Sequence, residues 1–344
     1  MKFSIRHLAV LSLSSLLIAA GCGNNNASNN TGSSANASAT ATAEAPTAPA
    51  SHKLNIKVSF YPMYEFTKNI TGDLADVEAL IPPGIEPHDW EPTAQDMAQI
   101  TKADVLVYNG AGMENWVDQV LDSASGSKLV AVEASKGLDI MEGAAEEEDE
   151  HEHSHEHANK EGEDHHHDHG GLDPHVWLDP ALAVKEVRNI EAALAAAAPE
   201  HAEAFKANAD VYISKLEALD QEFREATKEV KRKDFITQHA AFGYLAKEYG
   251  LTQVPIAGLS PEEEPSAAKM AEIVEFAKTH NVKTIFFETL VSSSVADTIA
   301  KEIGAKTAVL NPIEGLTEED RSHNLDYLGI MRQNLEALKI ALNE

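Results

Sequence analysis

Apolar and polar residues follow two different periods along most of the chain, and the two periods alternate. Short runs of alternating or continuous apolar residues predict strands, and they occur in both halves of the sequence. In the first half these runs are 54–62, 77–81, 104–110 and 128–134, and in the second half 234–238, 252–258, 282–288 and 306–312. Stretches of helical periodicity lie between most of them. This alternation predicts βαβ units and parallel sheets.

A long helical pattern separates the two groups of strands. Five large apolar residues recur at helical spacings of seven, four, three and four: Phe205, Tyr212, Leu216, Leu219 and Phe223. Residues 200–233 contain neither Gly nor Pro, and this stretch is longer than an average globular helix. A surface helix of a single domain is one interpretation, and a rigid connector between two lobes is the other, which is favoured because strands resume after it. The predicted fold class is therefore α/β, with two lobes, each a mainly parallel sheet flanked by helices, joined by one long rigid helix.

The N-terminus has the pattern of an export signal. Basic Lys2 and Arg6 precede the apolar run LAVLSLSSLLIAAGC, which is short for a membrane span and ends in small residues. Cys22, the only cysteine of the chain, follows these small residues as in the lipobox that it resembles. A lone cysteine can form no internal disulfide. We expect a signal peptide over 1–21 and lipidation of Cys22; an ordinary signal peptide with an incidental cysteine is the alternative.

The predicted domains follow from these patterns. Residues 22–53 are rich in Asn, Ser, Ala and Thr and cannot offset their ordering entropy by burial, so we expect a disordered tether that anchors the protein to the outer face of a cell membrane, as on a Gram-positive surface. The folded part is expected to comprise an N-terminal lobe over 54–180, connecting helices over 181–230 and a C-terminal lobe over 231–344.

Charged residues are most concentrated in one segment, which we interpret as an insertion. The 344 residues carry a net charge of −29, which argues against a nucleic-acid partner because phosphate binding needs clustered Lys and Arg. Within the loop predicted over 142–171, twelve acidic residues accompany the single base Lys160. The loop also holds eight of the sixteen histidines: His151, His153, His155, His157, His165, His166, His167 and His169. We expect it to collect metal ions weakly, since each bound ion must order flexible chain; a solvated tract without a role is the alternative.

Three histidines outside this loop have unusual surroundings. His88 lies in a Pro- and Gly-rich segment that follows a predicted strand. His175 stands between two Asp-Pro pairs, which restrict the backbone on both sides. His239 lies between a predicted strand and a predicted helix, where α/β sheets place ligand groups. Together they are candidate metal ligands.

Six segments in this order make the sequence similar to a known family. They read PPGIEPHDWEPTAQD, NGAGMENWVD, DPHVWLDP, QHAAFGYLAKEYGL, GLSPEEEPS and LNPIEGLTEED. They resemble the signature segments of the substrate-binding lipoproteins of bacterial metal ABC transporters, in the zinc-uptake branch of cluster A-I. The resemblance covers the chain from about residue 54 to the C-terminus. It implies two α/β lobes joined by a long helix, with one metal ion held between them by three histidines and a carboxylate.

The matching segments assign the family's metal ligands to residues of this chain. The resemblance implies His88, His175 and His239 as the histidines and Glu314, in the NPIEGL segment, as the carboxylate. Glu288, which follows a predicted strand in IFFETL, is the competing carboxylate. Asp89, Asp173 and Asp179 are candidate acceptors for the outer ring N–H groups of the histidines, or turn residues.

Three imidazoles and one carboxylate favour Zn²⁺ on chemical grounds. This nitrogen-rich, four-coordinate set suits tetrahedral zinc, whereas Mn²⁺ or Mg²⁺ would prefer more oxygen ligands. The family therefore implies a monomeric, extracytoplasmic, high-affinity zinc-binding protein that captures one Zn²⁺ and delivers it to a membrane ABC permease. It implies no catalytic residues and no organic cofactor.

Three alternatives remain open at this point. The first is a manganese-binding relative, in which the third and fourth ligands would both be carboxylates. The second is a surface adhesin of the same family. The third is a secreted zinc hydrolase, against which no predicted helix of the sequence carries a His-Glu-x-x-His motif and no Gly-x-Ser-x-Gly segment occurs.

Overall fold

The computed structural model describes residues 53–143 and 171–344. The predictions for the signal peptide, Cys22 and the tether therefore lie outside the described residues, as do those for the eight loop histidines. Glu142 and Leu172 form an antiparallel bridge, and the Gly143 amide donates to the Gly171 carbonyl. The two ends of the acidic segment thus lie side by side.

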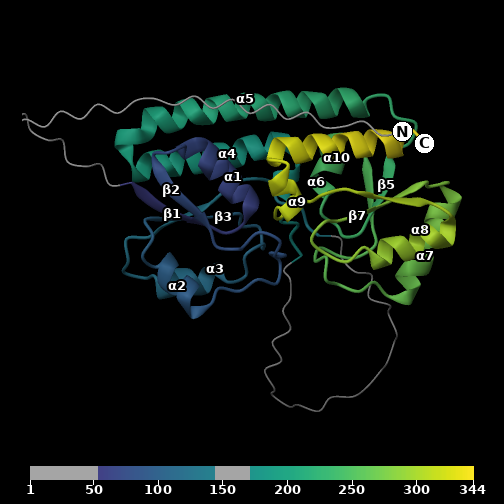
Figure 1. Cartoon of the computed structure of the whole chain (residues 1–344), viewed down its shortest axis with the longest axis horizontal. Coiled ribbons are helices and arrows are strands. Elements are labelled where there is room, and N and C mark those ends of the chain that lie inside the picture. Colours follow the sequence, from purple (N-terminus) through teal and green to yellow (C-terminus); the bar gives the residue numbers. More distant parts are fainter. Residues whose placement is uncertain (1–52, 144–170) are drawn as a thin grey trace, which may run out of the picture. The chain divides into compact units, whose positions relative to one another are not determined.

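Two four-stranded parallel sheets form the cores of the two lobes (Figure 1). The N-terminal sheet has the order β2-β1-β3-β4, and the C-terminal sheet has the equivalent order β6-β5-β7-β8. The strands are β1 Leu54–Val58, β2 Ala75–Ala79, β3 Val105–Tyr108, β4 Val130–Glu133, β5 Asp234–Thr237, β6 Thr252–Pro255, β7 Thr284–Phe287 and β8 Lys306–Val309. All eight correspond to predicted runs. In each sheet the second strand along the chain pairs with one side of the first strand, and the third strand pairs with its other side, so the strand order reverses there. Ligands of α/β proteins bind outside the carboxyl ends of the strands at such a reversal point.

The helices cover the sheets and cross between the lobes. They are α1 Tyr61–Thr71, α2 Ala94–Ile100, α3 Val117–Ser123, α4 Pro180–Ala197, α5 Ala202–Thr227, α6 Gly243–Glu248, α7 Ala267–Thr279, α8 Ser294–Ile303, α9 Glu318–Ser322 and α10 Tyr327–Leu342, with short 3-10 turns η1 Val176–Leu178 and η2 Pro199–His201. None of the helices in the described ranges is long and apolar enough to span a membrane.

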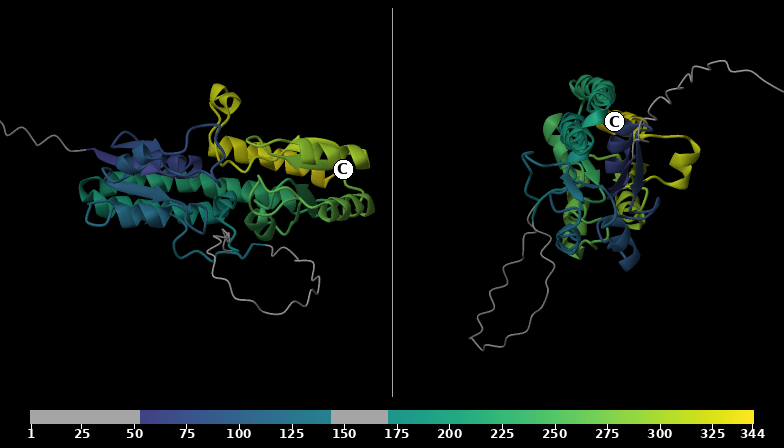
Figure 2. Two further views of the ribbon diagram at one scale, coloured as in Figure 1. Left: turned by 90° about the horizontal axis from the view of Figure 1, so that it is seen from below. Right: turned by 90° about the vertical axis from the view of Figure 1, so that its left-hand side faces the viewer.

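Helix α5 is the predicted connecting helix. It packs along α4 and α1 in the N-terminal lobe and against α10 in the C-terminal lobe (Figures 1 and 2). Its five predicted apolar positions are all buried. It ends at Thr227, short of the predicted 233, because Val230 is the only apolar residue between 228 and 233 and Lys233 Nζ donates to the Thr227 carbonyl (2.9 Å).

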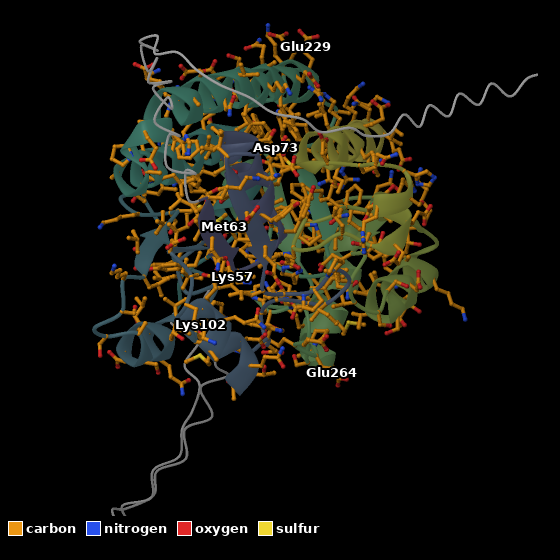
Figure 3. All side chains as sticks on the ribbon, turned by 60° about the vertical axis from the view of Figure 1, so that its left-hand side comes forward. Lys57, Met63, Asp73, Lys102, Glu229 and Glu264 are labelled. Atoms are coloured by element: carbon orange, nitrogen blue, oxygen red, sulfur yellow. The ribbon has the colours of Figure 1, made fainter. Side chains whose placement is uncertain are left out.

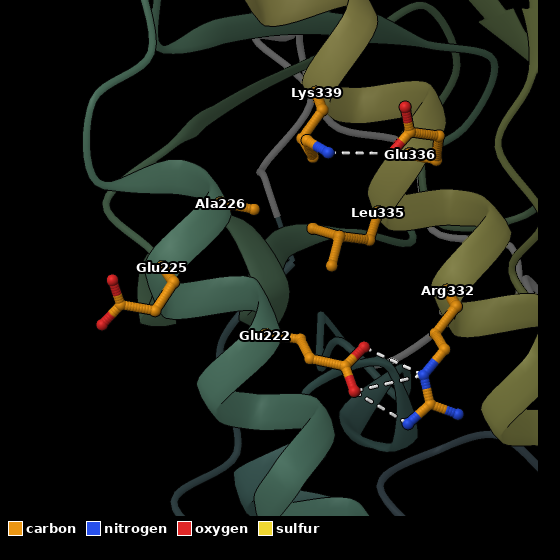
Figure 4. Close-up of a pocket in the computed structure, with 7 residues that line it drawn as sticks. All are labelled: Glu222, Glu225, Ala226, Arg332, Leu335, Glu336 and Lys339. Atoms are coloured by element: carbon orange, nitrogen blue, oxygen red, sulfur yellow. Dashed lines mark hydrogen bonds and ion pairs between the residues drawn. The ribbon is translucent and has the colours of Figure 1, made fainter.

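The apolar core does not stop at the boundary between the lobes. One cluster of buried side chains runs from the N-terminal lobe, where Met63 of α1 (labelled in Figure 3) is fully buried, through α4 and α5 to Phe235, Leu245 and Tyr327 in the C-terminal lobe. Two smaller clusters lie under α7 and α8 and under α2 and α3. At the surface, Glu222 of α5 accepts a forked pair of hydrogen bonds from Arg332 of α10 (2.9 Å each; Figure 4). The two lobes therefore share a continuous apolar core.

Candidate metal centre

The structure brings together the four residues that the sequence nominates as ligands. His88 lies in the long loop between β2 and α2, His175 directly precedes η1, His239 follows β5 by two residues, and Glu314 lies in the loop between β8 and α9. The ligand atoms of these four residues all lie within 4.8 Å of one another. Among the residues that the structure describes, no other group of His, Cys, Asp and Glu has this geometry.

Three imidazole nitrogens and one carboxylate oxygen face a common centre. Glu314 Oε1 lies 3.1 Å from His88 Nε2, 3.3 Å from His175 Nε2 and 3.5 Å from His239 Nε2. His175 Nε2 lies 3.2 Å from His88 Nε2 and 3.3 Å from His239 Nε2. Neutral nitrogens and a carboxylate at such spacing can surround a single small cation.

Asp173 fixes the orientation of the His175 ring. Asp173 Oδ1 accepts hydrogen bonds from the His175 amide (3.0 Å) and from Nδ1 of the ring (2.8 Å). With its proton on Nδ1, the ring presents the Nε2 lone pair to the centre. The aspartate of the second Asp-Pro pair, Asp179, instead caps α4 by accepting from the Ala181 amide (2.8 Å), with Pro180 at the first helical position.

Glu288 orients the third histidine. Its Oε1 accepts from the His239 amide (3.1 Å) and from Nδ1 of the ring (2.5 Å). The sequence leaves Glu288 as a competitor of Glu314, but the structure places it behind His239, while Glu314 faces all three Nε2 atoms. Glu288 and His239 follow β7 and β5, the adjacent strands at the reversal point of the C-terminal sheet.

His88 has a more open environment than the other two histidines. Its side chain is 10% exposed, whereas those of His175 and His239 are fully buried. Glu86 Oε1 accepts from the His88 amide (2.9 Å). Asp89, a candidate acceptor for the ring, makes no hydrogen bond to it within the described ranges, so the support of this ring differs from that predicted. Glu86 is the acidic neighbour that sequence reasoning missed.

Burial and charge shift the pKa values of the site in opposite directions. Burial lowers the pKa of His88, and the hydrogen bond that Glu314 accepts from its Nε2 only partly opposes this effect. Burial also lowers the pKa of His239, but the charges and hydrogen bonds of Glu288 and Glu314 outweigh it and raise the pKa to about 10. Burial raises the pKa of Glu314, but hydrogen bonds from the three histidines hold it well below its usual range. These shifts favour a protonated His239 in the metal-free site at neutral pH.

Comparisons with known proteins show the family of the chain. A family model described as zinc-uptake complex component A, periplasmic (ZnuA), matches residues 56–341. The high-affinity zinc uptake system protein ZnuA of Bacillus subtilis is 50% identical over 335 residues, which are 97% of this chain and 97% of that protein. The zinc-binding lipoprotein AdcA of Streptococcus pneumoniae is 47% identical over 290 residues, and the match covers 84% of this chain but only 56% of AdcA.

A solved structure agrees with the fold. The Zn(II)-bound ZnuA-like domain of Streptococcus pneumoniae AdcA aligns with a TM-score of 0.72 and 43% identity, over 85% of this chain and 100% of that domain. The predicted architecture, two α/β lobes joined by a long helix, is confirmed.

Proposed function

This chain belongs to the zinc-uptake complex component A family, and from that premise we propose that it captures one Zn²⁺ outside the cytoplasm and delivers it to an ABC permease. The family is a metal-binding component of transport systems, not a family of enzymes, so the hydrolase alternative is set aside. The zinc ion is the cargo. In this proposal His88, His175, His239 and Glu314 are its ligands.

One observation carries the proposal: three Nε2 atoms and one carboxylate oxygen converge, and two of the three rings are oriented by buried carboxylates. Zinc prefers four ligands of this kind in tetrahedral geometry, and outer carboxylates raise the basicity of the histidines that they orient. The third ligand is a nitrogen, which argues against the manganese alternative because Mn²⁺ suits oxygen-rich sites. No described feature favours the adhesin alternative.

The accessory parts of the proposal concern residues outside the described ranges. We propose that Cys22 carries a lipid that holds the protein on the membrane, and that the eight histidines between His151 and His169 collect zinc for the buried site. Glu142 and Leu172, which flank this segment, are paired. This pairing supports the proposal that the segment is an insertion that can be deleted without disturbing the fold. Deleting 144–170 is therefore expected to leave the buried site intact and to reduce zinc uptake only when zinc is scarce.

The main experiment measures zinc affinity and transport for single-ligand variants of the mature chain. His175→Ala, His239→Ala and Glu314→Ala are each expected to weaken binding by more than about 100-fold, since loss of an outer partner alone costs 10- to 100-fold. Cells that carry these variants should fail to grow when zinc is limiting. The matched control is His323→Ala, at an exposed histidine of the C-terminal lobe.

Two outcomes would contradict the proposal. Unchanged zinc affinity in all three ligand variants would show that these residues do not bind zinc. Tight zinc binding by the unaltered protein, combined with normal uptake in cells that lack it, would leave a zinc-binding protein without the proposed transport role.

A further inference from the structure

Glu314 differs from the histidine ligands in how it is held. Buried carboxylates fix the rings of His175 and His239, but in the described residues the hydrogen bonds of the Glu314 carboxylate go to the site histidines themselves. The position of its oxygen therefore depends on the backbone of the turn that carries it, residues 311–316. We call this segment the Glu314 turn.

The backbone of this turn is strained next to the ligand. Ile313, the residue before Glu314, has a φ of 60°, in the left-handed region that β-branched residues rarely adopt. Among the described residues, the other non-glycine residues with positive φ are Ala111, Asn281 and Asn324, none of which is β-branched. Such strain persists only where the surroundings enforce it, and it concentrates at functional sites.

Buried side chains enforce the strained conformation. Asn334 of α10 accepts from the Asn311 amide (2.8 Å) and donates to the Asn311 carbonyl (2.7 Å). Asn311 Oδ1 in turn accepts from the Ile313 amide (2.8 Å), and Trp177 Nε1 donates to the Pro312 carbonyl (2.8 Å). Asn334 is only 2% exposed and Trp177 is fully buried, so water does not compete for these bonds.

A cavity adjoins the turn. It has a volume of about 380 Å³, and its lining includes Glu314, Gly315 and Leu316 together with Tyr61 of α1 and Ala79 of β2. Glu314 thus belongs both to the metal centre and to the lining of the cavity. If the turn relaxes, the carboxylate has space to enter.

Building on the proposed function, we propose that Asn334 is a positioning residue, which holds the Glu314 turn against the metal, and that Glu314 is the ligand that leaves first, into this cavity, when zinc is released. Asn334 touches neither zinc nor its ligand atoms and acts through Asn311 and the strained Ile313. Loosening the turn should therefore accelerate release, and filling the cavity should slow it.

The test measures zinc release from the loaded mature chain into excess chelator by stopped flow, with the association rate measured separately. Asn334→Leu keeps the size of the side chain and removes its hydrogen bonds, and it is expected to speed release by about tenfold, the low end for partners that orient a ligand. Trp177→Phe, which removes the donor to Pro312, should act in the same direction. Ala79→Phe, which fills the cavity, should slow release.

Two controls separate positioning from general loss of stability. Leu342→Ala removes a fully buried side chain two turns further along α10 and should lower the free energy of unfolding without speeding release. In a Glu314→Gln background, adding Asn334→Leu should change release no further, because the carboxylate ligand that Asn334 positions is already lost. A merely structural role would give additive effects instead.

The outcomes distinguish this inference from the proposed function. A chain that binds no zinc contradicts both. Tight binding in the unaltered chain, with release from Asn334→Leu no faster than from Leu342→Ala, or with release from Ala79→Phe unchanged, contradicts the inference alone.

Discussion

At the scale of single residues, two carboxylates decide which nitrogen each buried histidine offers. Asp173 and Glu288 accept hydrogen bonds from Nδ1 of His175 and His239, so the Nε2 atoms of both rings face the centre. The sequence indicates the Asp173 contact, because Asp173 lies only two positions from His175. It does not indicate the Glu288 contact, which joins residues 49 positions apart through the pairing of β5 with β7.

The outer role of Glu288 can be measured. Glu288→Ala is expected to weaken zinc binding by about 10- to 100-fold, because the His239 ring loses the acceptor that fixes its orientation and its basicity. Competition with a chromogenic chelator measures the change. Glu272→Ala, at an exposed position on α7, is the control, and equal affinities of the two variants would show that Glu288 does not support the site.

Zinc binding should release protons at neutral pH. His239 has its pKa raised to about 10 in the metal-free protein, and a protonated Nε2 cannot bind a metal. We therefore expect at least about one proton to leave per zinc bound at pH 7, and zinc affinity to rise between pH 6 and pH 9. Calorimetry in two buffers of different ionisation enthalpy measures the number of protons released per zinc ion, and identical heats in both buffers would rule out this release.

The raised pKa of His239 also affects the stability of the metal-free protein, which should decrease as pH rises, whereas zinc affinity increases. A histidine whose pKa is raised in the folded state stabilises the fold fully at pH values below its unfolded pKa. The contribution is lost as pH rises through about 10. The free energy of unfolding of metal-free protein should therefore decrease towards pH 10, and Glu288→Gln should flatten that part of the curve. A metal-free stability that rises with pH over this range would contradict the assignment.

At the scale of elements, the pattern of apolar residues predicts the strands better than their ends. The second strand is predicted over 77–81 but β2 is Ala75–Ala79, because its partner β1 ends at Val58 and the apolar Leu80 and Ile81 pack beyond the ladder. Helix α3 is short, seven residues with only Val117 and Val120 buried. Its periodicity is too brief to detect in a sequence.

Helix α5 provides a direct test of the connecting element. Ser214 is exposed in the middle of this helix, so Ser214→Pro should lower the free energy of unfolding by about 3 kcal/mol or more, through a lost hydrogen bond and a clash with the preceding turn. Ser214→Ala is the matched control and should be neutral or slightly stabilising. Chemical denaturation measures both, and equal midpoints would show that α5 does not contribute as a continuous helix.

At the scale of the whole folded part, the shared core and α5 limit how far the lobes can separate. Opening the site widely would expose apolar side chains of the cluster that continues through α4 and α5 into the C-terminal lobe. That exposure costs roughly 25 cal/mol for each Å². We therefore expect release to proceed through a local change near one ligand.

Spin labels on the two lobes measure this opening. Lys102, after α2, and Glu264, before α7, are both exposed and labelled in Figure 3, and each can be replaced by Cys in a Cys22→Ser background. The distance between the labels should change by about 2 Å or less on zinc binding, which is the scale of helix shifts at packed interfaces. A change typical of a wide hinge rotation would overturn this expectation.

The contacts that the sequence could not predict are those between distant segments. The motifs nominate His88, His175, His239 and Glu314, but nothing in the local pattern shows that Asn334 bonds to the backbone of Asn311, 23 positions away. Nor does any pattern mark the left-handed conformation of Ile313, since isoleucine is among the residues least expected there. Tertiary packing, rather than local preference, decides both.

The four candidate ligands come from segments spread over most of the chain, with His88 and Glu314 separated by 226 positions. A polypeptide that crosses a membrane N-terminus first, as the first 21 residues predict, cannot assemble this site until Glu314 has emerged. A product of interrupted synthesis that ends before residue 314 lacks at least one ligand. The protein should therefore be exported empty, whatever the metal content of the cell interior, and acquire its ion only after its complete chain has folded outside.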